Sequence, residues 1–193
     1  MTATILSPTD LRLITTAEYH RMAEVGILVA DEQIELIAGQ IVQKMPKGFA
    51  HSALCKRIEK LIESLLGDKV LVRLQDPVQL DIYSEPEPDI AVVYPNPNFY
   101  DDHHPASNEI FVIIEIADST IERDLSTKAD LYAASGITDY WVVNVKAQQL
   151  HVFRDPQANG YQRQTILKTQ QSTSFLAFPD CVIDVQACFG LAK

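Results

Sequence analysis

Apolar residues recur at intervals of three and four along residues 49–66, which places them on one face of a helix. Gly67 follows directly and is a natural stop, so the pattern predicts a long amphipathic helix. Helices are also expected after Thr15, which has capping-box spacing to Glu18, and over residues 124–135. The segments between them follow a different pattern.

Short apolar or alternating runs, typical of strands, fill most of the remaining chain. A hairpin is expected with arms at residues 34–37 and 40–43 and Ala38-Gly39 at the turn. Further strands are expected at residues 70–74, 78–82, 90–93, 110–116, 139–144, 150–154, 161–167 and 182–185. This order predicts a mixed α/β (α+β) fold around a central sheet, because strands and helices do not alternate regularly.

The strand expected at residues 110–116 contains one acid, Glu115, among apolar residues of both parities. A strand that is apolar on both faces is typical of the middle of a sheet. A lone buried carboxylate costs several kcal/mol unless it is paired, protonated or bound to metal. Asp89 opens the preceding strand, so the two acids are expected to meet if these strands pair.

Two carboxylates and a lysine are the groups that a metal-dependent phosphodiesterase requires. Asp89 and Glu115 are the expected ligands of Mg²⁺ or Mn²⁺, with the backbone carbonyl of Ile116 as a further ligand. Lys128, on the next helix, is expected to position the attacking water and to offset the charge that develops on phosphorus.

Tyr132 lies one helical turn after Lys128 and Asp124 one turn before it, which predicts that the three share a helix face. Taken singly, Lys128 would face solvent or pair with Asp124, and Tyr132 would be a packing residue. The combination carries the prediction, because it joins two acids on successive strands to a lysine on the following helix.

Two residues of the N-terminal half are further candidates. Glu35 is expected to be an exposed strand residue, because it alternates with apolar neighbours, and His51 opens the long helix. Near a metal site, either would serve as an extra ligand or would orient a ligand. The adjacent pair His103-His104 lies in a proline-rich loop expected over residues 94–108 and carries no functional prediction by itself.

The length of 193 residues suits one domain. We expect an arm at residues 1–14, a core at residues 15–155, and C-terminal strands with a turn at residues 156–193. No apolar run approaches a membrane span, and the first residues lack a secretory signal pattern. The three cysteines lack metal-type spacing, so we expect reduced thiols in a cytoplasmic protein with no membrane partner.

The net charge of −10 argues against tight, non-specific binding of DNA, because nucleic-acid-binding proteins are usually basic, at least in patches. Carboxylates that belong to a metal site add to this negative count. A local basic patch is still compatible with the total.

A set of motifs runs along roughly residues 15–155. It comprises Glu-Leu-Ile-x-Gly-x-Ile-Val (35–42), His51 on a helix, Pro-Glu-Pro-Asp-Ile-Ala-Val-Val (86–93), Ile-Glu-Ile-Ala-Asp-Ser-Thr (114–120), Asp124, Lys128, Leu-Tyr-Ala (131–133), Gly136 and Tyr-Trp-Val-Val (140–143). Together these motifs resemble the Uma-two family of endonucleases, which is assigned to the PD-(D/E)XK, restriction-endonuclease-like superfamily.

The resemblance implies a restriction-endonuclease-like core of α-β-β-β-α-β order, with a central mixed sheet flanked by helices and a divalent-metal site. It implies that Asp89 is the Asp of the PD motif and Glu115 the D/E. The superfamily pattern places lysine where this chain has Ala117, and the resemblance suggests that the lysine has moved to the next helix, as Lys128. The segment after Glu115 is also shorter than the Glu-Val-Leu-Ser-Pro-Ser-Thr form common in the family.

The residues and the resemblance predict a Mg²⁺- or Mn²⁺-dependent endonuclease that hydrolyses DNA. Two alternatives stay open. One is a non-catalytic binding or assembly module on the same fold, which the acidic charge favours. The other is a hydrolase of small phosphoesters, which suits an acidic surface better than long DNA does. A homodimer is expected by analogy, because superfamily nucleases often act as dimers.

Overall fold

The computed structural model describes residues 11–29, 31–118 and 121–190. Most of the expected N-terminal arm lies outside these residues, as do Ser119 and Thr120. The helices and strands, in chain order, are α1 (Thr16–Glu24), β1 (Ile34–Ile37), β2 (Gln40–Gln43), α2 (Phe49–Leu66), β3 (Leu71–Leu74), β4 (Ile90–Val93), β5 (Ile110–Ala117), α3 (Ile121–Leu125), α4 (Thr127–Ala134), β6 (Asp139–Asn144), β7 (Gln149–Gln157), β8 (Gly160–Lys168), β9 (Ser172–Phe175), β10 (Phe178–Asp184) and α5 (Val185–Phe189).

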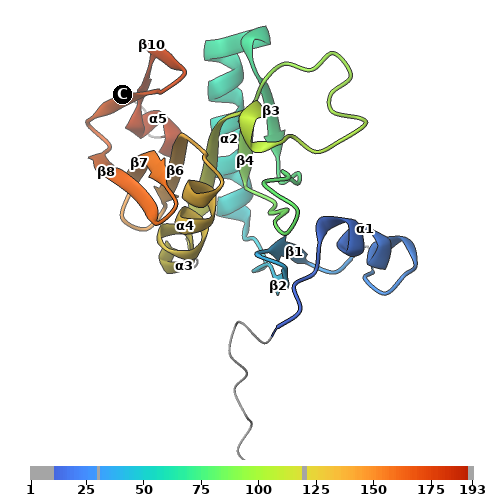
Figure 1. The fold of residues 1–193 in the computed structure, drawn as a ribbon. Helices are drawn as coiled ribbons and strands as arrows, with labels where there is room; N and C mark the ends of the chain where they lie inside the picture. The colour runs from blue at the N-terminus through green and yellow to red at the C-terminus, as the bar shows by residue number, and fades with distance from the viewer. Residues whose placement is uncertain (1–10, 30, 119–120, 191–193) are drawn as a thin grey trace, which may run out of the picture.

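A six-stranded sheet of order β3-β4-β5-β6-β7-β8 forms the centre of the protein (Figure 1). Strands β5 and β6 are parallel, and every other neighbouring pair in this sheet is antiparallel. The predicted mixed α/β fold with a central sheet is confirmed, and the run α2-β3-β4-β5-α3-α4-β6 follows the expected order, with its second helix divided in two. None of the described helices is long and apolar enough to cross a membrane.

Helices cover both faces of this sheet, and the alternation of side chains along the strands shows which helix covers which face. Ile114 and Trp141 pack in one cluster with Ile58 of α2, together with residues of α5. Ile113 packs in a second cluster with Tyr132 of α4. The middle strands are therefore buried on both sides, as the apolar run around Glu115 predicted.

The strand expected at residues 78–82 does not form. The amide of Val78 donates to the carbonyl of Pro86 and that of Leu80 to Ser84, at 3.0 Å each, so the segment folds back on itself. Val78 is fully buried in the core beneath this loop. The alternating pattern therefore reflected a loop whose residues Val78 and Leu80 pack on the core, not a sheet edge.

The helix expected over residues 124–135 is broken at Ser126, which separates α3 from α4. Ser126 has φ −122° and ψ −85°. Its hydroxyl donates to the carbonyl of Glu122 at 2.6 Å, which competes with regular helix bonding. Asp124 and Lys128 thus lie on different helices, so the prediction that Asp124 shares a helix face with Lys128 and Tyr132 is wrong, whereas Lys128 and Tyr132 do lie one turn apart in α4.

A hairpin of β9 and β10 follows the main sheet. The sequence predicted a short strand at residues 182–185, which covers the end of β10, but it did not predict β9. Buried residues from this region, Phe175 and Ile183, close the core beneath α2.

Candidate active site

The pairing of β4 with β5 brings the two predicted acids together. Ile90 pairs with Ile114 in this antiparallel ladder. Asp89, which precedes Ile90, therefore lies next to Glu115, which follows Ile114. The amide of Asp89 donates to Glu115 Oε2 at 3.4 Å. Asp89 Oδ2 in turn accepts from the amide of Ile116 at 2.8 Å. Both carboxylates are buried at the end of the sheet.

Asp89 is held as an anion by two basic side chains. His51 Nε2 lies 2.9 Å and Lys47 Nζ 3.1 Å from Asp89 Oδ1. Burial alone would raise the pKa of Asp89, but the hydrogen bond and charge of His51 and the charge of Lys47 lower it to about 2. The same contact raises the pKa of His51 to about 10, although burial opposes this shift.

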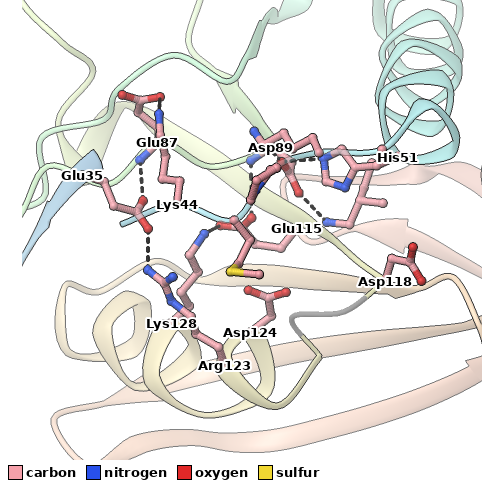
Figure 2. Close-up of a pocket in the computed structure, with 15 residues that line it drawn as sticks. Glu35, Lys44, His51, Glu87, Asp89, Glu115, Asp118, Arg123, Asp124 and Lys128 are labelled. Atoms are coloured by element: carbon pink, nitrogen blue, oxygen red, sulfur yellow. Dashed lines mark hydrogen bonds and ion pairs between the residues drawn. The ribbon is translucent and has the colours of Figure 1, made fainter. Parts of the chain in front are cut away.

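Glu115 is bound by the two α4 side chains that the sequence placed one turn apart. Lys128 Nζ donates to Glu115 Oε1 at 2.7 Å, and the Tyr132 hydroxyl donates to the same oxygen at 2.9 Å (Figure 2 labels Glu115 and Lys128). Burial raises the pKa of Glu115 to about 8; the Lys128 charge opposes this shift, and Asp89 and Asp124 add to it.

Lys128 remains a buried cation. Burial would lower the pKa of Lys128, but the neighbouring carboxylates, of which Glu115 is the strongest, outweigh this effect and raise it. The lysine therefore keeps its proton in a site from which most solvent is excluded. Ala117 stands where the superfamily pattern has lysine, and a lysine from α4 reaches the acid instead.

Glu35 was expected to be exposed, and this prediction is wrong. It is 2% exposed, because all four residues of β1 are buried. Arg123 donates to Glu35 Oε1 at 2.6 Å, and the amide of Glu87 donates to Oε2 at 3.1 Å. Figure 2 shows this pair beside Lys44, which forms an ion pair with Glu87.

The sequence did not single out the cations Lys44, Lys47 and Arg123, which line one pocket with Asp89, Glu115 and Lys128. The position of the two lysines in the sequence could have indicated that they lie near the site. They lie in the short connection between the hairpin and α2, which carries His51 in its first turn. That connection has to pass the same end of the sheet. Arg123 gave no such indication, because its contact with Glu35 depends on how α3 docks against the β1–β2 hairpin.

The donor set of the pocket fits a hard divalent cation. The carboxylates of Asp89, Glu115, Glu35 and Asp124 are buried and line one pocket, and they supply the oxygen ligands that Mg²⁺ and Mn²⁺ prefer. Lysine, arginine and histidine side chains balance part of this charge. His51 and Cys55 add nitrogen and sulfur within 4.8 Å of an Asp89 oxygen, so a softer ion has ligands on that side.

Comparison with known proteins points to one family. The model of a family described as Uma2, "Putative restriction endonuclease", matches residues 16–186. A solved structure described as "a putative nuclease belonging to DUF820 from Anabaena variabilis ATCC 29413" is similar with a TM-score of 0.69 and 19% identity, covering 92% of this chain and 98% of the other. This likeness shows a shared fold. A comparison with curated proteins gave no match.

Proposed function

The chain belongs to the Uma2 family, and on this premise we propose that it is a Mg²⁺- or Mn²⁺-dependent nuclease that hydrolyses phosphodiester bonds in DNA. The observation that carries the proposal is a chain of contacts in one buried site: Lys128 bonds Glu115 at 2.7 Å, and Glu115 accepts from the amide of Asp89 on the adjacent strand at 3.4 Å. Asp89, Glu115 and the carbonyl of Ile116 are the proposed ligands, and Lys128 is the proposed catalytic cation.

When bound, the ion polarises the scissile phosphate and lowers the pKa of the attacking water. The protein's own groups position the water and the metal ligands. Lys128, fixed by Glu115, donates to the attacking water and offsets negative charge that develops on phosphorus. His51 and the amide of Ile116 each bind one oxygen of Asp89 and so fix the orientation of its carboxylate.

The remaining residues of the pocket have supporting roles in this proposal. Tyr132 shares Glu115 Oε1 with Lys128 and restrains the acid. The Glu35–Arg123 pair holds α3 against the β1–β2 hairpin, since Arg123 also donates to the carbonyl of Gln43 at 3.3 Å. Asp124 adds negative charge that favours a bound cation.

Cleavage of supercoiled plasmid in Mn²⁺ or Mg²⁺ tests the proposal. Asp89→Asn, Glu115→Gln and Lys128→Met each remove a proposed catalytic group at nearly constant size. Each is expected to lower the cleavage rate by about a hundredfold or more. Glu122→Gln is the matched control, because Glu122 is an exposed acid of the adjacent helix α3. Equal activity of all four variants would refute the assignment.

Thermal unfolding with and without Mn²⁺ separates catalysis from ion binding. An ion that binds the folded protein at a hundredfold excess over Kd raises the free energy of unfolding by about 2.7 kcal/mol. Wild type and Glu122→Gln are expected to show this rise, and Asp89→Asn and Glu115→Gln are expected to lose it.

A non-catalytic binding module is the second candidate, and one observation favours it. The oxygens of Asp89 and Glu115 already accept hydrogen bonds from protein donors, so the acids also suit a self-contained polar network. This function predicts no Mn²⁺-dependent rise and no plasmid cleavage by wild type. If wild type instead cleaves only mononucleotide esters, and short oligonucleotides do not compete, the substrate is a small phosphoester.

A further inference from the structure

A second cluster of ligand-type side chains lies outside the pocket and unites three distant segments. His20 is in α1, Glu85 follows β3 in the segment that leads to β4, and His104 is in the long loop before β5. His20 Nε2 lies 2.7 and 2.9 Å from the two oxygens of Glu85. His104 Nε2 lies 4.0 Å from Glu85 Oε1. One ligand atom from each residue lies within 4.8 Å of the others.

The partners of Glu85 distinguish it from other buried acids. Glu35, Asp89, Glu115 and Asp139 each form an ion pair with lysine or arginine. Glu85 is 4% exposed, yet across the described part of the chain its ion-pair partners within 4.0 Å are two imidazoles. A cation bound between these side chains would balance the charge of the buried carboxylate.

Backbone hydrogen bonds position the three segments independently of these side chains. The amide of Thr16 at the start of α1 donates to Ile82 at 2.9 Å, and that of Gln79 donates to Pro105, beside His104, at 3.0 Å. The amide of Glu85 donates to Leu36 of β1 at 2.8 Å. The ligand atoms are thus brought close together by the fold, which limits the ordering that an ion would require.

We propose that His20, Glu85 and His104 bind a divalent transition-metal ion, of which Zn²⁺ is the biological example. Two imidazole nitrogens and one carboxylate form a set that suits Zn²⁺, Co²⁺ or Ni²⁺, whereas Mg²⁺ prefers oxygen ligands alone. The His20 and His104 side chains are 46% and 35% exposed, so solvent reaches the site and completes the coordination.

The ion has a structural role in this position. It joins α1 and the long loop to the segment that ends in Glu87 and Asp89, and both of these residues line the candidate active site. Binding therefore stabilises the fold around the entry of β4. The site is separate from the pocket, and its occupancy can be measured without any nuclease activity.

Isothermal titration with Zn²⁺ tests the proposal on untagged, EDTA-treated protein. The titrations use a His51→Ala parent, because His51, Cys55 and Asp89 form another potential zinc-binding group. His20→Ala and His104→Ala are each expected to weaken Zn²⁺ binding by about tenfold or more, since each removes one of three protein ligands. His103→Ala is the matched control, because its exposed imidazole neighbours His104 in the sequence but pairs with Asp102 and Glu109.

Cobalt provides an independent readout, because Co²⁺ in a nitrogen-oxygen site absorbs visible light. The parent and His103→Ala should give this absorption, and His20→Ala and His104→Ala should lose it. Equal circular dichroism and equal unfolding midpoints in EDTA establish that the variants are folded. If His20→Ala and His104→Ala bind Zn²⁺ as tightly as the parent, the proposed site is wrong. It is also wrong if His103→Ala loses as much affinity for Zn²⁺ as these two variants do.

Discussion

Buried acids in this protein differ in what surrounds them, and that difference separates structural from candidate catalytic residues. Asp139 is fully buried and accepts from Arg154, from the indole of Trp141 and from the amide of Leu176. These bonds fasten β6 to β7 and to the turn after β9, away from the pocket. Glu115 is equally buried but lines the pocket beside another carboxylate. Burial of an acid is therefore no evidence of a site until its neighbours are known.

His151 gives a prediction about acid sensitivity. It is 5% exposed in β7, and its Nε2 is buried without a partner among the described residues. Burial lowers the pKa of His151. Below pH 6.5 the unfolded chain takes up a proton that the folded chain resists, so stability falls as the pH falls. Replacement by leucine should flatten the dependence of the free energy of unfolding on pH between 7 and 5, measured by urea denaturation.

His103 is the control for this experiment, because its exposed ring lies beside Asp102, which raises the pKa of His103. A group with a raised pKa stabilises the fold at low pH, so His103→Asn should leave the acid-induced loss in place. If His151→Leu keeps the wild-type slope, the buried imidazole does not resist protonation in the folded state.

At the scale of elements, sequence patterns succeeded where one local rule decided the outcome. The helix at residues 49–66 has the predicted bounds, because its apolar spacing and Gly67 agree. The capping box from Thr15 to Glu18 forms as expected. The strand prediction for residues 78–82 was wrong, because alternation in a short segment does not distinguish a strand from a loop that packs alternate apolar residues on the core.

The candidate site was predictable only as far as strand pairing reaches. An acid at the start of one buried strand and an acid near the end of the next must meet if the strands are antiparallel neighbours, and Asp89 and Glu115 do so. Glu35 escaped prediction, because its burial depends on how the β1–β2 hairpin docks against Arg123. Docking of separate elements leaves no periodic trace in the sequence.

The β1–β2 turn gives a prediction about this docking. Gly39 has φ +73°, and a Cβ added there would lie 2.5 Å from Leu13 Cβ. Gly39→Ala therefore suffers both left-handed backbone strain of about 1–2 kcal/mol and a clash of about 1–3 kcal/mol. Gly26→Ala is the matched control, because Gly26 has φ +76° and nothing within 4 Å of a built Cβ.

Urea denaturation should therefore show a larger loss of stability for Gly39→Ala than for Gly26→Ala, with the difference measuring the clash. Equal losses would mean that residue 13 moves aside freely and that the segment before α1 does not restrain the hairpin.

At the scale of the whole molecule, a net charge of −10 surrounds a pocket with several cations. Lys44, Lys47, Arg123 and Lys128 all line that pocket. Each is paired with a carboxylate, so the local field is balanced and not strongly positive. A phosphate that approaches this pocket competes with those carboxylates for the cations. The acidic surroundings also repel the phosphate, and this repulsion is strongest at low ionic strength, where screening is weakest.

Lys47 tests how this arrangement engages DNA. Its side chain is 25% exposed and bonds Asp89 at 3.1 Å, so it lies where the proposed site meets solvent. On a Glu115→Gln background, which prevents cutting, Lys47→Gln should weaken duplex binding at low salt. It should also reduce the slope of log K against log salt by about 0.9, the value for one phosphate contact. Lys60→Gln, at an exposed lysine of α2, should leave the slope unchanged. If both variants keep the parental slope, Lys47 contacts no phosphate, and its role is confined to holding Asp89 ionised.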